Sequence, residues 1–150
     1  MLATLYGVVS LALHVLVLGA AVVWGRRPER LAALVLTSAM VGTITFQNRS
    51  FDGVDLQLAT LDVLQLVALF VIAVATGRRW IVFACAFTLL SLVIHGARWL
   101  LGTQVTAFPY LTVYALLSYA VVTCLAFGTI SAHRRRHKRE ATGLLSVSAT

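Results

Sequence analysis

The sequence predicts an all-α integral membrane bundle of five transmembrane helices, with the N-terminus outside the cell and the C-terminus in the cytoplasm. Composition indicates the membrane, because 60% of the 150 residues are hydrophobic and 11% are charged, whereas soluble domains are about 45–50% apolar and about 25% charged. Five apolar stretches separated by short polar gaps give the number of helices. The distribution of basic residues over those gaps gives the orientation.

Most of the apolar stretches have the length of a membrane span, which needs about 20 apolar residues. No basic residue precedes the first stretch and no small-residue cleavage site stands before Arg26, so this stretch predicts an uncleaved anchor. The third, fourth and fifth stretches are long enough to span, and short gaps predict that consecutive helices are antiparallel neighbours. The predicted spans cover about residues 2–24, 31–46, 56–76, 80–101 and 107–130.

The second stretch, residues 31–46, is short and carries Thr37, Ser38, Thr43 and Thr45, so a re-entrant or surface helix is an alternative. With five spans, ten of the twelve Lys and Arg residues lie on the cytoplasmic side: three in the first gap, two in the third and five in the tail. With four spans, seven of the twelve basic residues lie on the cytoplasmic side and five lie outside. Because basic residues near span ends stay in the cytoplasm, we predict five spans.

Residues 133–150 follow the last span as a basic cytoplasmic tail, which we predict to be disordered. Its charges hold this end inside and attract anionic lipid, at about 1 kcal/mol per basic residue near the surface. The net charge of +7 does not indicate nucleic-acid binding, because the charges follow the topology and no aromatic-interleaved basic surface lies outside the bilayer. The basic residues at the membrane surface are Arg134, Arg135, Arg136, Lys138 and Arg139.

Aromatic residues gather near both predicted interfaces. Trp24 and Trp80 fall at the cytoplasmic ends of their spans, and Trp99, Phe108 and Tyr110 fall near the outer ends. Tryptophan and tyrosine concentrate where the hydrocarbon meets the lipid headgroups. We therefore expect these side chains to form two aromatic belts around the bundle.

Ionisable side chains within the spans should face the interior, because each costs about 2.5–3.5 kcal/mol at a helix centre on insertion scales. Ser91, His95 and Arg98 share one helical face. Folding each hairpin about its loop places Asp62, His95 and Tyr114 at one level, about 9–10 Å below the outer surface at 1.5 Å per residue. The predicted outward-facing polar cluster consists of Asp62, His95, Arg98, Tyr114, Gln65, Ser91, Ser118 and, at greater depth, His14.

Two interpretations of this cluster stay open. As a structural lock, Asp62 pairs with His95 or Arg98 and holds the helices in register, and losing one partner of a buried pair typically costs about 3–5 kcal/mol. As a binding pocket or proton relay open to the outside, His95 titrates and Asp62 sets its tautomer or stabilises its cation. In that interpretation Arg98, one turn above, receives an anionic group.

We expect no cofactor and no metal, and we assign no catalytic residue. A bis-histidine haem needs ligands at similar depth, whereas His14 and His95 differ by about 9 Å in depth at 1.5 Å per residue. Zinc needs three or four ligands, and Asp62 with His95 supplies two. Cys85 and Cys124 fall in the inner halves of their spans, on the reducing side of the membrane, so we interpret them as packing residues.

Four features of the chain carry a resemblance to other proteins. They are the segment RRPERLAA at residues 26–33, Asp62, the segment HGAR at residues 95–98, and the arginine-rich end. In these features the whole chain resembles uncharacterised short multi-span proteins of bacterial inner membranes. The resemblance implies a bacterial plasma-membrane location and no specific activity.

Small size, short loops and the lack of a catalytic constellation favour a non-enzymatic accessory protein or subunit of a membrane complex. Such a protein acts through a membrane-protein partner or as a homo-oligomer. The alternative is a small transporter or sensor that uses the outward-facing polar cluster and a titrating histidine. A haem-binding or other membrane enzyme is the third hypothesis.

Overall fold

The computed structural model describes residues 2–47, 56–101 and 107–147, with side chains over residues 8–9, 11–45, 56–101 and 109–136. The described residues form five α-helices and no strand, which confirms the predicted all-α class. The helices are α1 (Leu2–Trp24), α2 (Arg27–Gln47), α3 (Leu56–Thr76), α4 (Arg79–Leu101) and α5 (Ala107–Val147).

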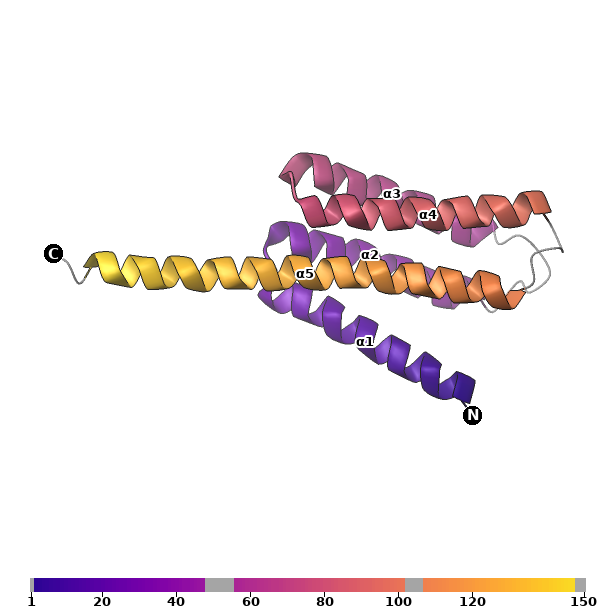
Figure 1. Ribbon diagram of the computed structural model, residues 1–150, viewed down its shortest axis with the longest axis horizontal. Helices are drawn as coiled ribbons and strands as arrows, with labels where there is room; N and C mark the ends of the chain where they lie inside the picture. The colour runs from indigo at the N-terminus through magenta and orange to yellow at the C-terminus, as the bar shows by residue number, and fades with distance from the viewer. Residues whose placement is uncertain (1, 48–55, 102–106, 148–150) are drawn as a thin grey trace.

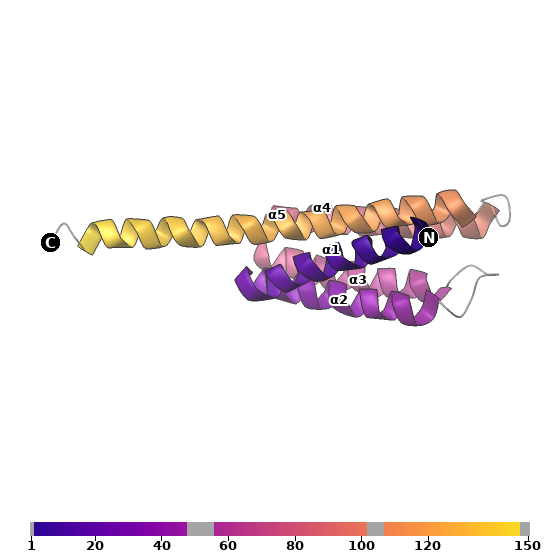
Figure 2. The ribbon, with the colours of Figure 1, turned by 90° about the horizontal axis from the view of Figure 1, so that it is seen from below.

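Consecutive helices run antiparallel and close into a ring (Figure 1). The contacts follow the order α1–α2–α3–α4–α5 and return to α1, and α2 also contacts α5 across the ring. The turn between α1 and α2 and the turn between α3 and α4 lie at one end of the bundle, beyond which α5 extends (Figures 1 and 2). We call this end the turn end.

Helix α2 begins at Arg27, four residues earlier than predicted, because its first turn is capped. Pro28 suits the first turn of a helix, where its missing N–H costs nothing. The carboxylate of Glu29 reaches back to accept a hydrogen bond from the backbone N–H of Arg26 at 3.0 Å. A glutamate at the third helical position that caps in this way forms half of a capping box. Residues 27–30, which precede the predicted span, therefore form the first turn of α2.

The turn between α3 and α4 depends on Gly77. Its φ of 61° lies in the left-handed region, which glycine adopts without a steric penalty. The Gly77 N–H donates to the carbonyl of Ala73 at 2.8 Å, the bond of an αL helix cap. Helix α4 can therefore start at Arg79, directly after a two-residue connection.

Helix α5 continues to Val147, so residues 133–147 of the tail, for which disorder was predicted, are helical in this structure. Arginine, lysine, glutamate, alanine and leucine dominate this segment, and all have high helix propensity. Residues 148–150 lie outside the described residues.

Small side chains let the helices approach closely at the turn end. Ala21, Ala32 and Ala33 are fully buried, as are Leu69 and Leu125. Small residues at helix contacts are typical of membrane bundles, because they increase van der Waals packing between backbones. The core of the turn end is Leu18, Ala21, Ala32, Ala33, Leu36, Leu69, Ala73, Ile81, Ala84, Val121 and Leu125.

Three helices are long and apolar enough to cross a membrane among the residues with described side chains: Leu56–Thr76, Arg79–Leu101 and Pro109–Arg136. Leu11–Trp24 is a shorter apolar helix. Large apolar side chains cover the outside of these helices; Val74 and Leu100, for example, are 71% and 79% exposed. A helix that is apolar on its outer face as well as its inner face is typical of a membrane span.

Candidate functional site

A buried pair of ionisable side chains joins α3 to α4. His95 Nε2 lies 3.2 Å from Asp62 Oδ2, and the two residues are 4% and 6% exposed. His95 belongs to a stripe on α4 with Thr88 and Ser91, spaced by three and four residues and buried throughout. The regular spacing places the whole stripe on the face that looks into the bundle.

Two tyrosines of α5 complete the cluster. The Tyr110 hydroxyl lies 2.7 Å from His95 Nδ1, and the Tyr114 hydroxyl donates to Asp62 Oδ1 at 3.4 Å. Both ring nitrogens of His95 are therefore hydrogen-bonded. We call Asp62, His95, Tyr110 and Tyr114 the His95 network, and it links α3, α4 and α5.

Arg98 does not pair with Asp62 in this network. Its guanidinium carbon lies 4.3 Å from the centroid of the Tyr110 ring, a cation–π geometry. Of the two predicted partners of Asp62, the structure therefore selects His95. Arg98 instead covers the tyrosine that hydrogen-bonds His95.

His95 also borders the outer surface of the bundle. Together with Leu56, Leu92 and Trp99 it lines an apolar groove of about 460 Å³ between α3 and α4. His95 thus contacts the other three residues of the His95 network and also lines this groove.

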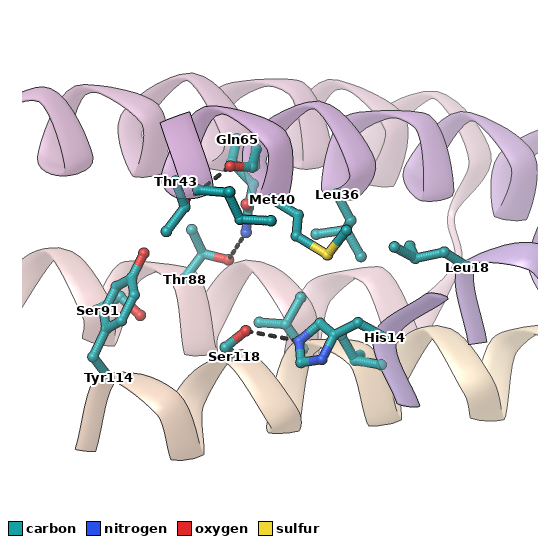
Figure 3. A pocket seen from close by; sticks show the side chains of 14 residues that line it. His14, Leu18, Leu36, Met40, Thr43, Gln65, Thr88, Ser91, Tyr114 and Ser118 are labelled. Atoms are coloured by element: carbon teal, nitrogen blue, oxygen red, sulfur yellow. Dashed lines mark hydrogen bonds between the residues drawn. The ribbon is translucent and has the colours of Figure 1, made fainter. Parts of the chain in front are cut away.

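A cavity lined by both polar and apolar side chains lies beside the His95 network, in the centre of the ring (Figure 3). Its volume of about 120 Å³ suits about four water molecules at roughly 30 Å³ each. All five helices contribute to it. The polar lining consists of His14 of α1, Thr43 of α2, Gln65 of α3, Thr88 and Ser91 of α4, and Tyr114 and Ser118 of α5. We call it the central cavity.

Two hydrogen bonds cross the central cavity between neighbouring helices. His14 Nε2 lies 3.1 Å from the Ser118 hydroxyl, which joins α1 to α5. The Gln65 amide donates to the Thr88 hydroxyl at 3.2 Å, which joins α3 to α4. Figure 3 shows both pairs pointing into the same space from opposite sides.

Tyr114 connects the two parts of the site, because its hydroxyl bonds Asp62 and its ring lines the central cavity. Toward the turn end the lining becomes apolar, at Leu18, Leu36, Val121 and Val122. Leu18, Leu36 and Val121 also belong to the core of the turn end. The polar part of the bundle therefore stops about halfway along its length.

The eight predicted site residues all belong to this arrangement. Asp62 is hydrogen-bonded to both His95 and Tyr114, and Arg98 reaches this group through Tyr110. The other predicted residues line the central cavity: His14, Gln65, Ser91 and Ser118.

Sequence reasoning missed four contributors. Tyr110 was expected in the outer aromatic belt, but it is 7% exposed and bonds His95; its spacing of four from Tyr114 was the available signal. Thr43 and Met40 of α2 line the cavity, and nothing in their local sequence indicated it. Glu29 is fully buried at the turn end with one carboxylate oxygen, Oε1, unpartnered.

The remaining sequence candidates are dispersed. Among the residues with described side chains, no three His, Cys, Asp or Glu residues come together as metal ligands. Cys85 and Cys124 are free and half-buried against the core. Arg134, Arg135 and Arg136 are exposed on α5, whereas the side chains of Lys138 and Arg139 lie outside the described residues.

Comparisons of the chain with protein-family models, with curated proteins and with solved structures found no match. The functional argument therefore depends on the site itself.

Proposed function

We propose that all five helices cross the inner membrane of a bacterium, with the N-terminus outside and the turn end in the cytoplasm. The 23 and 21 residues of α1 and α2 correspond to about 32–35 Å at 1.5 Å per residue, enough for a hydrocarbon core of about 30 Å. The arginines in the two described turns and the basic part of α5 fall on the same side, as the positive-inside rule requires. Reporter fusions test this: a C-terminal fluorescent protein should fold in the cytoplasm, and a periplasmic reporter there should be inactive.

Within this topology we propose that the protein is a small proton-handling transporter or sensor. The observation that carries the proposal is the position of Tyr114, which joins a buried Asp62–His95 pair to a cavity with room for water. Ionisable groups inside a membrane bundle commonly mark proton relays and ion pathways. A drug-sized ligand site has about 300–1,000 Å³, so a cavity of about 120 Å³ favours water and protons over a large substrate.

The His95 network can exchange a proton without losing a hydrogen bond to the ring. With neutral His95, the Tyr110 hydroxyl donates to Nδ1 and Nε2–H donates to Asp62. With the imidazolium, both ring nitrogens donate, Nδ1 to the Tyr110 oxygen and Nε2 to the carboxylate. The groups that face His95 are the Asp62 carboxylate and the hydroxyls of Tyr110 and Tyr114, with the Arg98 cation behind Tyr110.

The apolar core at the turn end separates the central cavity from the cytoplasmic side. In the described part of the chain, the central cavity lies on the far side of this core from the cytoplasm, so protons would reach the network from the outer side. A transporter of this design needs a second conformation that opens the core, whereas a sensor needs only a change of packing around His95.

Reconstitution of the purified protein into liposomes that contain a pH-sensitive dye tests the proposal. The wild type is compared with His95→Gln, and Thr60→Ala serves as the matched control, because the Thr60 hydroxyl is exposed and bonds only its own helix. Proton flux that requires His95 supports transport. A pH-dependent change of tryptophan fluorescence without flux, lost in His95→Gln, supports sensing. If folded wild-type protein shows neither response, the proposal is wrong.

A second candidate is a non-enzymatic subunit of a membrane complex, in which the His95 network is a structural lock. The observation that favours it is the closed hydrogen-bonding of the buried pair, with both ring nitrogens of His95 engaged. Purification from native membranes in mild detergent, followed by mass spectrometry, tests this role. A stoichiometric membrane-protein partner supports it, and a lone protein contradicts the hetero-complex.

A further inference from the structure

A second hollow lies on the outside of the bundle, between α1 and α5 near the turn end. This groove has a volume of about 370 Å³, and it is independent of the central cavity. Its walls include Leu16, Ala20 and Trp24 of α1 and Ile130, His133 and Arg134 of α5. We call it the α1–α5 groove.

The chemistry of the α1–α5 groove changes along its length. Leu16 and Ala20 make one end apolar, and Trp24, His133 and Arg134 close the end nearest the turn end. The distance from Leu16 to Trp24 along α1 is about 12 Å at 1.5 Å per residue. An apolar trough of this length that ends at cations matches an acyl chain attached to an anionic headgroup.

We propose that the α1–α5 groove binds one anionic phospholipid of the leaflet at the turn end. The acyl chain lies against Leu16, Ala20 and Ile130, and the phosphate meets Arg134. Basic pockets between transmembrane helices at the cytoplasmic side are suited to anionic headgroups. This inference rests on the membrane topology proposed above, but it does not depend on the function proposed for the His95 network.

The surroundings of the groove agree with a negative ligand. Arg135 and Arg136 follow Arg134 on the exposed part of α5, and the described residues that line the groove include no carboxylate. The rings of Trp24 and His133 lie 6.3 Å apart and tie the end of α1 to α5 at the level of the cations. An indole at this level is typical of the headgroup interface.

Native mass spectrometry of the purified full chain tests the proposal, with phosphatidylglycerol and phosphatidylcholine of identical acyl chains as probes. We expect preferential retention of phosphatidylglycerol. Arg134→Gln should weaken this binding about fivefold, since one basic residue near the surface contributes about that factor. Ala20→Phe should abolish the bound lipid, because it fills the apolar trough and leaves every charge in place.

Arg79→Gln is the matched control, because Arg79 is exposed at the same end of the bundle and does not line the groove. It should bind phosphatidylglycerol as the wild type does. Three results would overturn the proposal: equal binding of the two lipids, equal losses in Arg79→Gln and Arg134→Gln, or unchanged binding in folded Ala20→Phe. The last two would indicate diffuse attraction to the basic surface in place of a site. Helicity measured by circular dichroism confirms that each variant is folded.

Discussion

The two halves of the bundle are held together by different interactions. Away from the turn end, polar side chains from all five helices meet around the central cavity, and hydrogen bonds join the helices. At the turn end, alanine and aliphatic side chains fill the interior. One half is therefore specified by the pairing of polar groups and has room for water, whereas the other is specified by close packing.

This difference matters because the two kinds of contact respond differently to change. A buried polar network loses stability when one partner is removed, since the remaining group keeps its desolvation cost. A close-packed interface loses stability when volume is added, since side chains and backbones must move apart. Substitutions that remove a polar partner in one half, or add volume in the other half, therefore test whether the two halves are stabilised in these different ways.

Asp62→Ala should have the largest effect. It removes the carboxylate that accepts from His95 and Tyr114, and breaking one partner of a buried ionic pair costs about 3–5 kcal/mol. Unfolding in mixed detergent micelles measures the loss, with Thr60→Ala as a control on the same helix. A cost of Asp62→Ala below that of the control would mean that the network contributes nothing to the polar half.

Gly128→Leu, in the close-packed half, should cause the second-largest loss of stability. A Cβ added at Gly128 would lie 2.5 Å from Cε2 of Trp80, so a larger side chain must displace the indole at a cost of about 1–3 kcal/mol. Unfolding and the tryptophan emission spectrum report the change. Gly19→Ala is the control, because a Cβ at Gly19 meets nothing within 4 Å, and it should be neutral or stabilising by about 0.5–1 kcal/mol. Equal costs for the two would argue against close packing.

Glu29→Ala should cost about 1 kcal/mol, the usual value of an N-terminal cap. The variant loses the bond from the Arg26 N–H, although it also relieves a buried carboxylate whose Oε1 has no partner. Glu29→Gln keeps an acceptor for the cap and should be closer to the wild type. A Gln variant that is less stable than the Ala variant would contradict this role.

Gln65→Leu should have the smallest effect of the four. It removes one interhelical hydrogen bond to Thr88, and such bonds in membrane bundles average about 0.6 kcal/mol. A double-mutant cycle with Thr88→Val isolates the pairwise energy. A coupling above about 2 kcal/mol would mean that Gln65 belongs to the strongly coupled network and not to the wall of the cavity.

The sequence predicted the positions of the helices well, since long apolar runs bounded by arginine and glycine leave little choice. The proximity of Asp62, His95 and Tyr114 was also predictable. Where a short turn joins two helices, residues at equal distances from the turn lie at the same level in the bundle. These inferences use only length and periodicity, which are local properties.

The remaining features depend on tertiary packing. Met40 and Thr43 of α2 point into the central cavity because α2 packs against α3, α1 and α5, and its own sequence does not show this orientation. Tyr110 lies near an interface by position but is buried by rotation of α5. The early start of α2 was readable from Pro28 and Glu29, because proline and an acidic residue are common in the first turn of a helix, whereas the length of the apolar run alone did not include them.

Radiolytic hydroxyl-radical labelling of the wild-type protein in lipid tests whether the polar half of the bundle contains water and the packed half does not, because it oxidises sulfur side chains that lie beside water. Met40, Cys85 and Cys124 all pack against the core of the turn end, but only Met40 also lines the central cavity. We predict rapid oxidation of Met40 and slow oxidation of both cysteines, although thiols are intrinsically at least as reactive. Oxidation of the cysteines ahead of Met40 would contradict a wet polar half and a dry packed half.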